Sequence, residues 1–175
     1  KIKIEEALIK ILSSPNHSNK SWITNQYDQM VMCDTAQKSG SDAAIVRIHN
    51  KDKAIAISVD SSANYCKSYP ITGGKQIVCE NWRNLITVGA KPLAITNCLN
   101  FGNPENQEIM GEFAECLEGI KEACEFLNYP VVSGNVSFYN GTNKKNIYPT
   151  PVIGGVGLIQ KLSKPISHNF KKNNS

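Results

Sequence analysis

The distribution of apolar residues along the chain predicts several short strands. Five runs rich in β-branched or other apolar residues are expected to form them: 43–48, 54–59, 93–96, a run through Val132, and about 152–159. The polar segment 49–53 lies between the first two runs and predicts a hairpin turn. The apolar density of these runs indicates a sheet that is covered on at least one face.

Three other segments carry apolar residues at every third or fourth position, which is the spacing of an amphipathic helix. The first, 4–12, is followed by a turn-rich linker at 13–21. The second, 73–89, is expected to end near its last residue, because glycine favours the position after a helix. The third, 107–127, is the longest, and the segment 128–130 is expected to end it.

Length and composition suit one folded domain with irregular ends. The 175 residues are 41% apolar and 19% charged, which is enough to bury one sizeable core. Strands and helices in these proportions indicate an α+β or mixed α/β domain, in which two principal helices back the sheet.

The charge pattern argues against two classes of partner. The formal net charge of +4 comes from lysines scattered along the chain, with the densest pair at Lys171 and Lys172. Binding to a nucleic-acid backbone requires a concentrated basic face, so we expect no nucleic-acid partner. No apolar run approaches the length that spans a bilayer, so we expect no membrane partner either.

Six cysteines lie mostly within apolar stretches and form no Cys-x-x-Cys pair: Cys33, Cys66, Cys79, Cys98, Cys116 and Cys124. Such thiols behave as small core side chains in a reducing compartment, which favours the cytoplasm. A disulfide framework in an extracellular protein is the alternative, but no signal-peptide pattern is visible. Because the chain begins at Lys1 without an initiator methionine, we expect it to be a piece of a longer polypeptide.

The segment from Val131 to Asn140 carries the most informative polar residues. Gly134 lacks a Cβ and lets backbone approach an anion, Asn135 offers an amide oxygen to a hard cation, and Ser137 adds a hydroxyl. Asn135 and Ser137 are two residues apart and therefore share one face of a strand. Phosphate and metal binding is one interpretation of this segment, and an ordinary strand end followed by a turn is the other.

Several short motifs follow one another along the chain: Trp22–Asp28, Gly40–Ala44, Arg83–Leu85 with Gly89–Pro92, Leu99–Glu105, Ser133–Ser137 and Pro149–Pro151. In this order they resemble the motifs of the phosphoribosylformylglycinamidine synthase family. The resemblance covers roughly residues 22–160. The ordered set is specific, whereas any one of these motifs alone would not be.

The resemblance implies an α+β fold with a mixed, largely antiparallel sheet backed by two main helices. This is the fold of the amino-terminal domain of aminoimidazole ribonucleotide synthetase-like proteins. Residues 22–161 would form the amino-terminal module of the second internal repeat of the synthetase subunit. Residues 1–21 would be a linker or the end of a preceding domain, and residues 162–175 a polar tail or the start of the following one.

The family's activity is that of an ATP-dependent ligase of purine biosynthesis, which converts formylglycinamide ribonucleotide to formylglycinamidine ribonucleotide. In the implied reaction, ATP phosphorylates the amide oxygen of the substrate. Ammonia, released from glutamine by a glutaminase domain or subunit, then displaces the phosphate. Such chemistry depends on positioning and on electrostatic stabilisation with magnesium. The implied partners are the substrate, the glutaminase and the remaining domains of the synthetase.

Four residues match the family's main site. By this resemblance, Gly134 and Asn97 are ATP contacts, Asn135 is a magnesium ligand, and Ser137 contacts the ribonucleotide substrate. Asn97 stands where the family usually has aspartate, so a negative charge is lost but an oxygen is kept.

Some family members hold a second nucleotide, whose magnesium is bound by residues that match Asp60, Glu80 and Asn84. Glu80 and Asn84 are four positions apart on a predicted helix, so both side chains can point at one cation. The alternative is structural: Asp60 would end a strand, and the other two residues would lie on a solvated helix face.

The histidines limit what the chain can do by itself. His17, His49 and His168 fall in a linker, a hairpin loop and a polar tail, and none matches a catalytic motif of the family. We therefore expect no ligase activity from the isolated chain. A second hypothesis is an assembly role, because related modules pair their sheets across a two-fold axis. It predicts self-association through the sheet.

Overall fold

The computed structural model describes all residues except 1, 39, 144, 164–165 and 167–175. The chain divides into two compact units, residues 1–33 and residues 34–175. The Lys171–Lys172 pair and His168 lie outside the described residues. The predicted domain boundaries, after residues 21 and 161, stay predictions.

The first unit is helical. The predicted helix at its start is confirmed as α1 (Ile4–Leu12), and α2 (Ser21–Thr24) follows after a short 3-10 turn at Pro15–His17. A second 3-10 turn covers Val31–Cys33. None of the residues in these elements is buried, because the unit is too small to enclose a core of its own.

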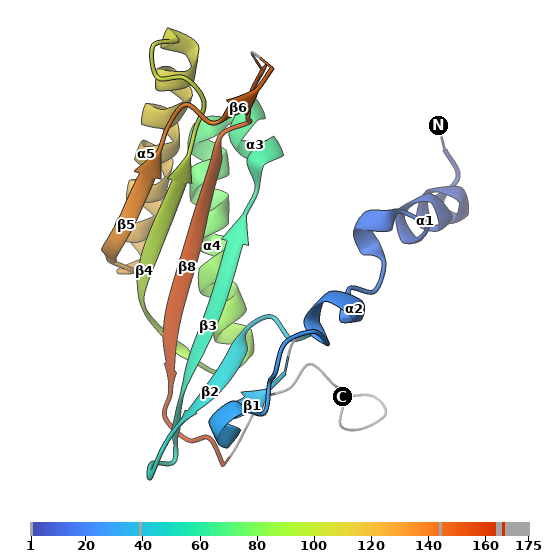
Figure 1. The fold of residues 1–175 in the computed structure, drawn as a ribbon, viewed down its shortest axis with the longest axis vertical. Helices are drawn as coiled ribbons and strands as arrows, with labels where there is room; N and C mark the ends of the chain where they lie inside the picture. Colours follow the sequence, from blue (N-terminus) through green and yellow to red (C-terminus); the bar gives the residue numbers. More distant parts are fainter. Residues whose placement is uncertain (1, 39, 144, 164–165, 167–175) are drawn as a thin grey trace. The chain divides into compact units, whose positions relative to one another are not determined.

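A six-stranded sheet forms the centre of the second unit (Figure 1). Its strands, in spatial order, are β1 (Thr35–Gln37), β2 (Ala44–Ile48), β3 (Lys53–Ser61), β8 (Thr150–Ile159), β4 (Lys91–Asn100) and β5 (Val131–Ser137). Only β4 and β5 run parallel, and every other neighbouring pair is antiparallel. A separate two-stranded ribbon pairs β6 (Gly141–Thr142) with β7 (Lys145–Asn146).

Helices cover one face of this sheet. The two long ones, α4 (Pro70–Thr87) and α5 (Gln107–Leu127), pack against each other and lie behind the sheet in Figure 1, with the short α3 (Ala63–Ser68) near one end. The core lies between these helices and the covered face of the sheet. The expected α+β fold, with a largely antiparallel sheet backed by two main helices, is confirmed.

Local sequence explains where the long helices end. The Asn106 side chain caps the start of α5 by accepting a hydrogen bond from the Glu108 amide (2.9 Å), and Asn128 ends the helix at φ +49°. Helix α4 ends at Thr87, and Gly89 follows at φ +81°, a conformation that glycine adopts without strain. The predicted ends of both helices are therefore confirmed.

Helix α4 begins three residues earlier than predicted, because its glycines lie inside the helix. A Cβ on Gly73 would collide with Cys66 of α3, and one on Gly74 would collide with the Cys116 carbonyl of α5. The two glycines let neighbouring helices approach closely, which offsets their low helix propensity.

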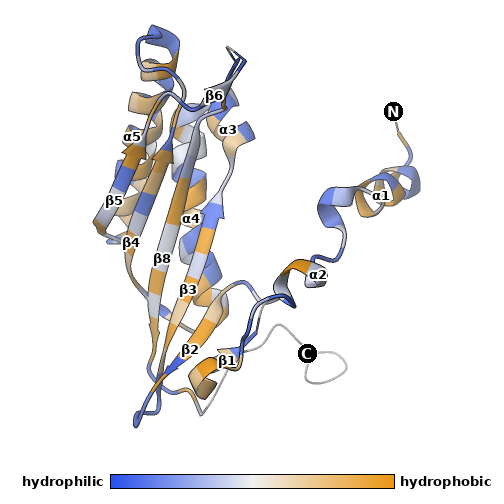
Figure 2. Cartoon of the chain, in the orientation of Figure 1, coloured by the Kyte–Doolittle hydropathy of each residue, from blue (hydrophilic) through white to orange (hydrophobic). Residues whose placement is uncertain are grey.

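The other face of the sheet is open to solvent within the described residues. Strand alternation directs Ile55, Ile57 and Val59 of β3 to this face, while Ala54 and Ala56 point into the core. Val156 of β8 pairs with Ile57 and lies on the same open face. Figure 2 shows hydrophobic segments along β2 and β3.

Candidate functional site

The four residues predicted for the main site all lie on the paired strands β4 and β5: Asn97, Gly134, Asn135 and Ser137. Because these strands are parallel, their carboxyl ends meet at the same edge of the sheet. The register places Asn97 beside Gly134, Cys98 beside Asn135, and Asn100 beside Ser137.

The structure corrects one local expectation. Segment 97–100 was expected to begin a loop and Ser133–Ser137 to follow a strand end, but both segments belong to strands. Strand β4 is long because it pairs with β8 on one side and β5 on the other, so its polar residues stay within the ladder. The chain turns only after Ser137, where Tyr139 has φ +59°.

Six polar residues form what we call the open-face row: Thr96, Cys98, Asn100, Ser133, Asn135 and Ser137. The predicted common face of Asn135 and Ser137 is confirmed by the register. The Ser133 hydroxyl donates to Thr96 Oγ1 over 2.8 Å. Asn135 is exposed, and its side chain hydrogen-bonds to no other described residue, so its amide is free to take an external ligand.

Asn97 and Gly134 lie on the opposite, helix-covered side of the same two strands. The half-buried Asn97 side chain rests directly against Gly134, and a Cβ on Gly134 would overlap Asn97 Oδ1. Only glycine therefore fits beside Asn97 without a shift of that amide. The predicted ATP pair is brought into contact, but the Asn97 side chain faces away from those of Asn135 and Ser137.

Asn140 holds the two strand ends together and was missed in the sequence. Its Nδ2 donates to the carbonyl oxygens of Ser137 and Phe101, each over 3.0 Å. The Phe101 amide in turn donates to the Ser137 carbonyl over 2.9 Å. The available signal was the Asn140-Gly141 turn, because asparagine side chains often bond nearby backbone in turns.

A second polar group lies between β3 and α4, and we call it the Asp60 network: Ser58, Asp60, Asn81, Asn84 and Tyr129. Asp60 Oδ2 accepts from Ser58 Oγ (2.7 Å) and Asn81 Nδ2 (2.8 Å). Asp60 Oδ1 accepts from Asn84 Nδ2 (2.8 Å). The structure thus brings together two of the three residues predicted for the second metal.

Glu80, the third predicted ligand, is half-buried on α4, one residue before Asn81 and one turn before Asn84. Among the described residues it forms no ion pair with a basic side chain. The same holds for Asp60, whose hydrogen-bond partners in this network are all neutral. A cation at this position would therefore meet negative charge that no described lysine, arginine or histidine neutralises.

Asn81 and Tyr129 belong to this network but were not predicted. Asn81 is fully buried and lies on the apolar stripe of α4 between Ile77 and Leu85. A polar residue on such a stripe is the signal that was available, because a buried amide requires partners. Nothing in the local sequence marks Tyr129, which follows α5 and donates a hydrogen bond to Asn81 Oδ1.

The donor set fits magnesium at the Asp60 network better than a transition metal. Within the described ranges, no three His, Cys, Asp or Glu side chains form a metal-binding group. Carboxylate and amide oxygens, as in Asp60 and Asn84, suit a hard cation. Asn135 supplies one amide oxygen and has no carboxylate at its paired position, Cys98. A cation there would need further oxygens from a phosphate group or from another part of the polypeptide.

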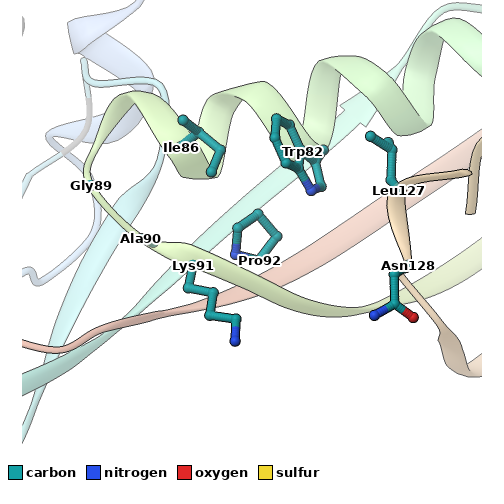
Figure 3. A pocket seen from close by; sticks show the side chains of 8 residues that line it. All are labelled: Trp82, Ile86, Gly89, Ala90, Lys91, Pro92, Leu127 and Asn128. Atoms are coloured by element: carbon teal, nitrogen blue, oxygen red, sulfur yellow. The ribbon is translucent and has the colours of Figure 1, made fainter.

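One surface depression lies away from both polar groups (Figure 3). This depression of about 450 Å³ opens beside the end of α4 and the beginning of β4, so it lies at the opposite end of β4 from the predicted site. Trp82, Pro92 and Leu127 form its apolar wall, with Lys91 and Asn128 at its rim. None of the predicted site residues lines it.

The described histidines do not join either polar group. His17 lies in the 3-10 turn of the first unit. His49 lies in the β2–β3 turn and pairs with Asp34 over 2.5 Å. Separately, no helix in the described part of the chain is both long and apolar enough to cross a membrane.

Comparison with known proteins supports the same family. A model described as AIR synthase related protein, N-terminal domain, matches residues 40–159. Phosphoribosylformylglycinamidine synthase subunit PurL of Pelagibacter ubique (strain HTCC1062) is 60% identical over 171 residues, which are 98% of this chain and 23% of that protein.

Solved structures agree with this match. PurLQS from Thermotoga maritima superposes with a TM-score of 0.80 at 35% identity, covering 87% of this chain and 25% of that chain. Thermotoga maritima PurL complexed with ATP, and the same protein complexed with FGAR, each give a TM-score of 0.74 at 36% identity over 85% of this chain and 24% of theirs.

The chain spans 23% of the length of its Pelagibacter relative. The chain belongs to the family described as AIR synthase related protein, N-terminal domain, and the resemblance to phosphoribosylformylglycinamidine synthase is confirmed.

Proposed function

We propose that this chain is part of an ATP-dependent ligase of purine biosynthesis. The complete enzyme would convert formylglycinamide ribonucleotide, ATP and ammonia from glutamine to formylglycinamidine ribonucleotide, ADP and phosphate. One observation carries this proposal: a chain 60% identical to a PurL subunit places Gly134, Asn135 and Ser137 at the shared carboxyl edge of two parallel strands. The Thermotoga PurL complexes with ATP and with FGAR support the same ligands.

At this edge, each residue has a distinct role in the proposal. β5 is the last strand of the sheet, so the Gly134 backbone can approach a nucleotide phosphate from its outer side, with Asn97 beside it. The free Asn135 amide would supply an oxygen ligand to magnesium, and Ser137 would contact the ribonucleotide. Bound magnesium would offset the charge of the triphosphate.

The Asp60 network is proposed as the place of a second magnesium, held by Asp60, Glu80 and Asn84 next to a second nucleotide. Its support is the unneutralised Asp60 carboxylate and the nearby Asn84 amide. Asn84 would turn its amide so that the oxygen, rather than the nitrogen, faces the cation.

The rest of the reaction would come from other parts of the synthetase. Neither described histidine, His17 or His49, lies in either polar group. We expect the isolated chain to release no phosphate from ATP with ammonia and substrate. A glutaminase domain or subunit, as the name of the Thermotoga PurLQS complex suggests, would supply ammonia in the cytoplasm.

A pair of matched substitutions tests the site. Asn135→Ala in the complete synthetase should weaken magnesium-dependent ATP binding by roughly 10-fold or more, because it removes a proposed metal ligand. Asn16→Ala changes the same residue type at an exposed position of the first unit and should leave binding unchanged. Titration calorimetry with and without magnesium measures both. Equal affinities for the two variants would contradict the assignment.

A second candidate function is assembly with a like domain. The open face carries Ile55, Ile57, Val59 and Val156, which are 37%, 41%, 67% and 39% exposed in the described chain. A contiguous apolar patch on a sheet favours association. Sedimentation should show self-association of the chain that Ile57→Lys abolishes, whereas Ile86→Lys, at an exposed position on α4, should not affect it. A strict monomer at high concentration would contradict this role.

A further inference from the structure

We propose that Asn81 and Tyr129 are positioning residues that hold the Asp60 carboxylate in the geometry a divalent cation requires. The proposal rests on the proposed metal site at Asp60. It adds two residues from separate elements, neither of which would touch the cation.

Asn81 sets the orientation of Asp60. Its Nδ2 donates to Asp60 Oδ2 over 2.8 Å and also lies 3.1 Å from the Ser58 carbonyl oxygen. The donor and the acceptor thus come from α4 and β3, and the Asn81 side chain is completely buried. A buried amide with fixed partners has one orientation, so the carboxylate it contacts is held without a metal.

Tyr129 decides which end of the Asn81 amide faces Asp60. Its hydroxyl donates to Asn81 Oδ1 over 2.8 Å, which leaves only the nitrogen directed at the carboxylate. Burial, with smaller contributions from Cys124 and Asp60, raises the pKa of the Tyr129 phenol above its usual value. The phenol therefore stays protonated and remains a donor at neutral pH.

Gly155 of β8 makes room for this contact. A Cβ at this position would overlap both Asn81 Oδ1 and the Tyr129 hydroxyl oxygen. Because Gly155 pairs with Ser58 across the β3–β8 ladder, it lies directly beneath the network. The segment after α5, through Tyr129, and β8, through Gly155, therefore both meet the Asn81 side chain of α4, which alone of the three contacts the Asp60 carboxylate.

The experiment measures Mn²⁺ binding to the full 175-residue chain by the loss of the free-ion electron paramagnetic resonance signal. Tyr129→Phe removes one hydroxyl and should weaken Mn²⁺ binding roughly 10-fold, the usual effect of losing a group that orients a metal ligand. Gly155→Ala should weaken it to a similar degree, because the added methyl separates Asn81 from Tyr129. Asp60→Asn should abolish binding.

Two controls separate positioning from stability. Tyr148→Phe makes the same chemical change at an exposed tyrosine and should leave Mn²⁺ affinity unchanged. Ile120→Val removes one buried methylene equivalent from α5 and should lower the melting temperature without changing the affinity. A structural role alone would make affinity follow melting temperature across all variants.

The outcomes are distinct. If Asp60→Asn abolishes binding while Tyr129→Phe and Gly155→Ala bind as tightly as the parent chain, the positioning role is overturned and the metal site stands. If Asp60→Asn binds Mn²⁺ like the parent chain, the proposed metal site is itself overturned and the positioning role with it.

Discussion

The two polar groups of this domain lie on opposite faces of the same sheet and are organised differently. In the Asp60 network, each member hydrogen-bonds to another, from Ser58 through Asp60 and Asn81 to Tyr129. In the open-face row, Ser133 bonds Thr96, but the Asn135 side chain has no partner among the described residues. The first group is bonded internally around a carboxylate that keeps its charge, and the second leaves the Asn135 amide for an external ligand.

Burial accounts for this difference. Ser58 and Asn81 of the network are buried between the sheet and α4, where a polar atom without a partner would cost about 1–3 kcal/mol. The sequence therefore has to supply a partner for every buried donor and acceptor, including Asn81 at 0% exposure. The open-face row contacts solvent, so its side chains can exchange water for a phosphate, a metal or a second domain at little cost.

The largest expected difference between the two polar groups is in the loss of stability when an asparagine of each is replaced by alanine. Asn81→Ala should lower the free energy of unfolding by about 3 kcal/mol. It leaves the buried Tyr129 hydroxyl without its acceptor and removes a hydrogen-bond donor to Asp60. Asn135→Ala should change it by no more than about 0.5 kcal/mol, since its amide has no described partner. Urea denaturation measures both values. Equal destabilisation would mean that Asn135 also has an internal role.

Cysteine reactivity should also differ between the open face and the helix-covered side. Cys98 is half-buried on the open face, whereas Cys124 is buried on the helix side, where burial raises its pKa to about 11. Only the thiolate reacts, and at pH 8 about one Cys124 thiol in a thousand is ionised. Iodoacetamide should therefore modify Cys98 roughly 100-fold faster.

Peptide mass spectrometry at a series of pH values follows both sites. Modification of Cys124 should speed up as pH rises toward 11, provided the domain stays folded, because the fraction of thiolate grows. The exposed Cys33 serves as the internal standard for a freely accessible thiol. Similar rates for Cys98 and Cys124 at pH 8 would show that the helix side is not closed.

The contact between Asn97 and Gly134, on the helix-covered side of β4 and β5, gives the smallest expected effect. Gly134→Ala should destabilise the domain by about 2 kcal/mol, because its Cβ would overlap Asn97. Truncating the neighbour in Gly134→Ala/Asn97→Ala should restore part of this loss, and thermal denaturation of the single and double variants measures the coupling. Strict additivity of the two substitutions would show that the side chains do not interfere.

Local sequence was sufficient to predict an element whose structure depends mainly on residues within a few turns of it. The predicted helix 107–127 matches α5 (Gln107–Leu127), since its apolar spacing, its Asn106 cap and the residues after it act within a few turns. The hairpin between β2 and β3 was predicted for the same reason, and their register pairs Ile48 with Lys53. The predictions for segment 97–100 and for the start of α4 were wrong, because strand pairing and helix packing with partners distant in sequence decided these structures.

Local sequence alone gave the long helix α5, the β2–β3 hairpin, the family through its ordered motifs, and the common face of Asn135 and Ser137, because these depend on neighbours along the chain. Tertiary structure decided which face of the sheet the helices cover, and so put Asn97 and Gly134 on one side and Asn135 on the other. It also joined Asn81 to Asp60 and Tyr129, which are 21 and 48 positions away. Such contacts form only when separate elements pack around one core, and no local pattern encodes them.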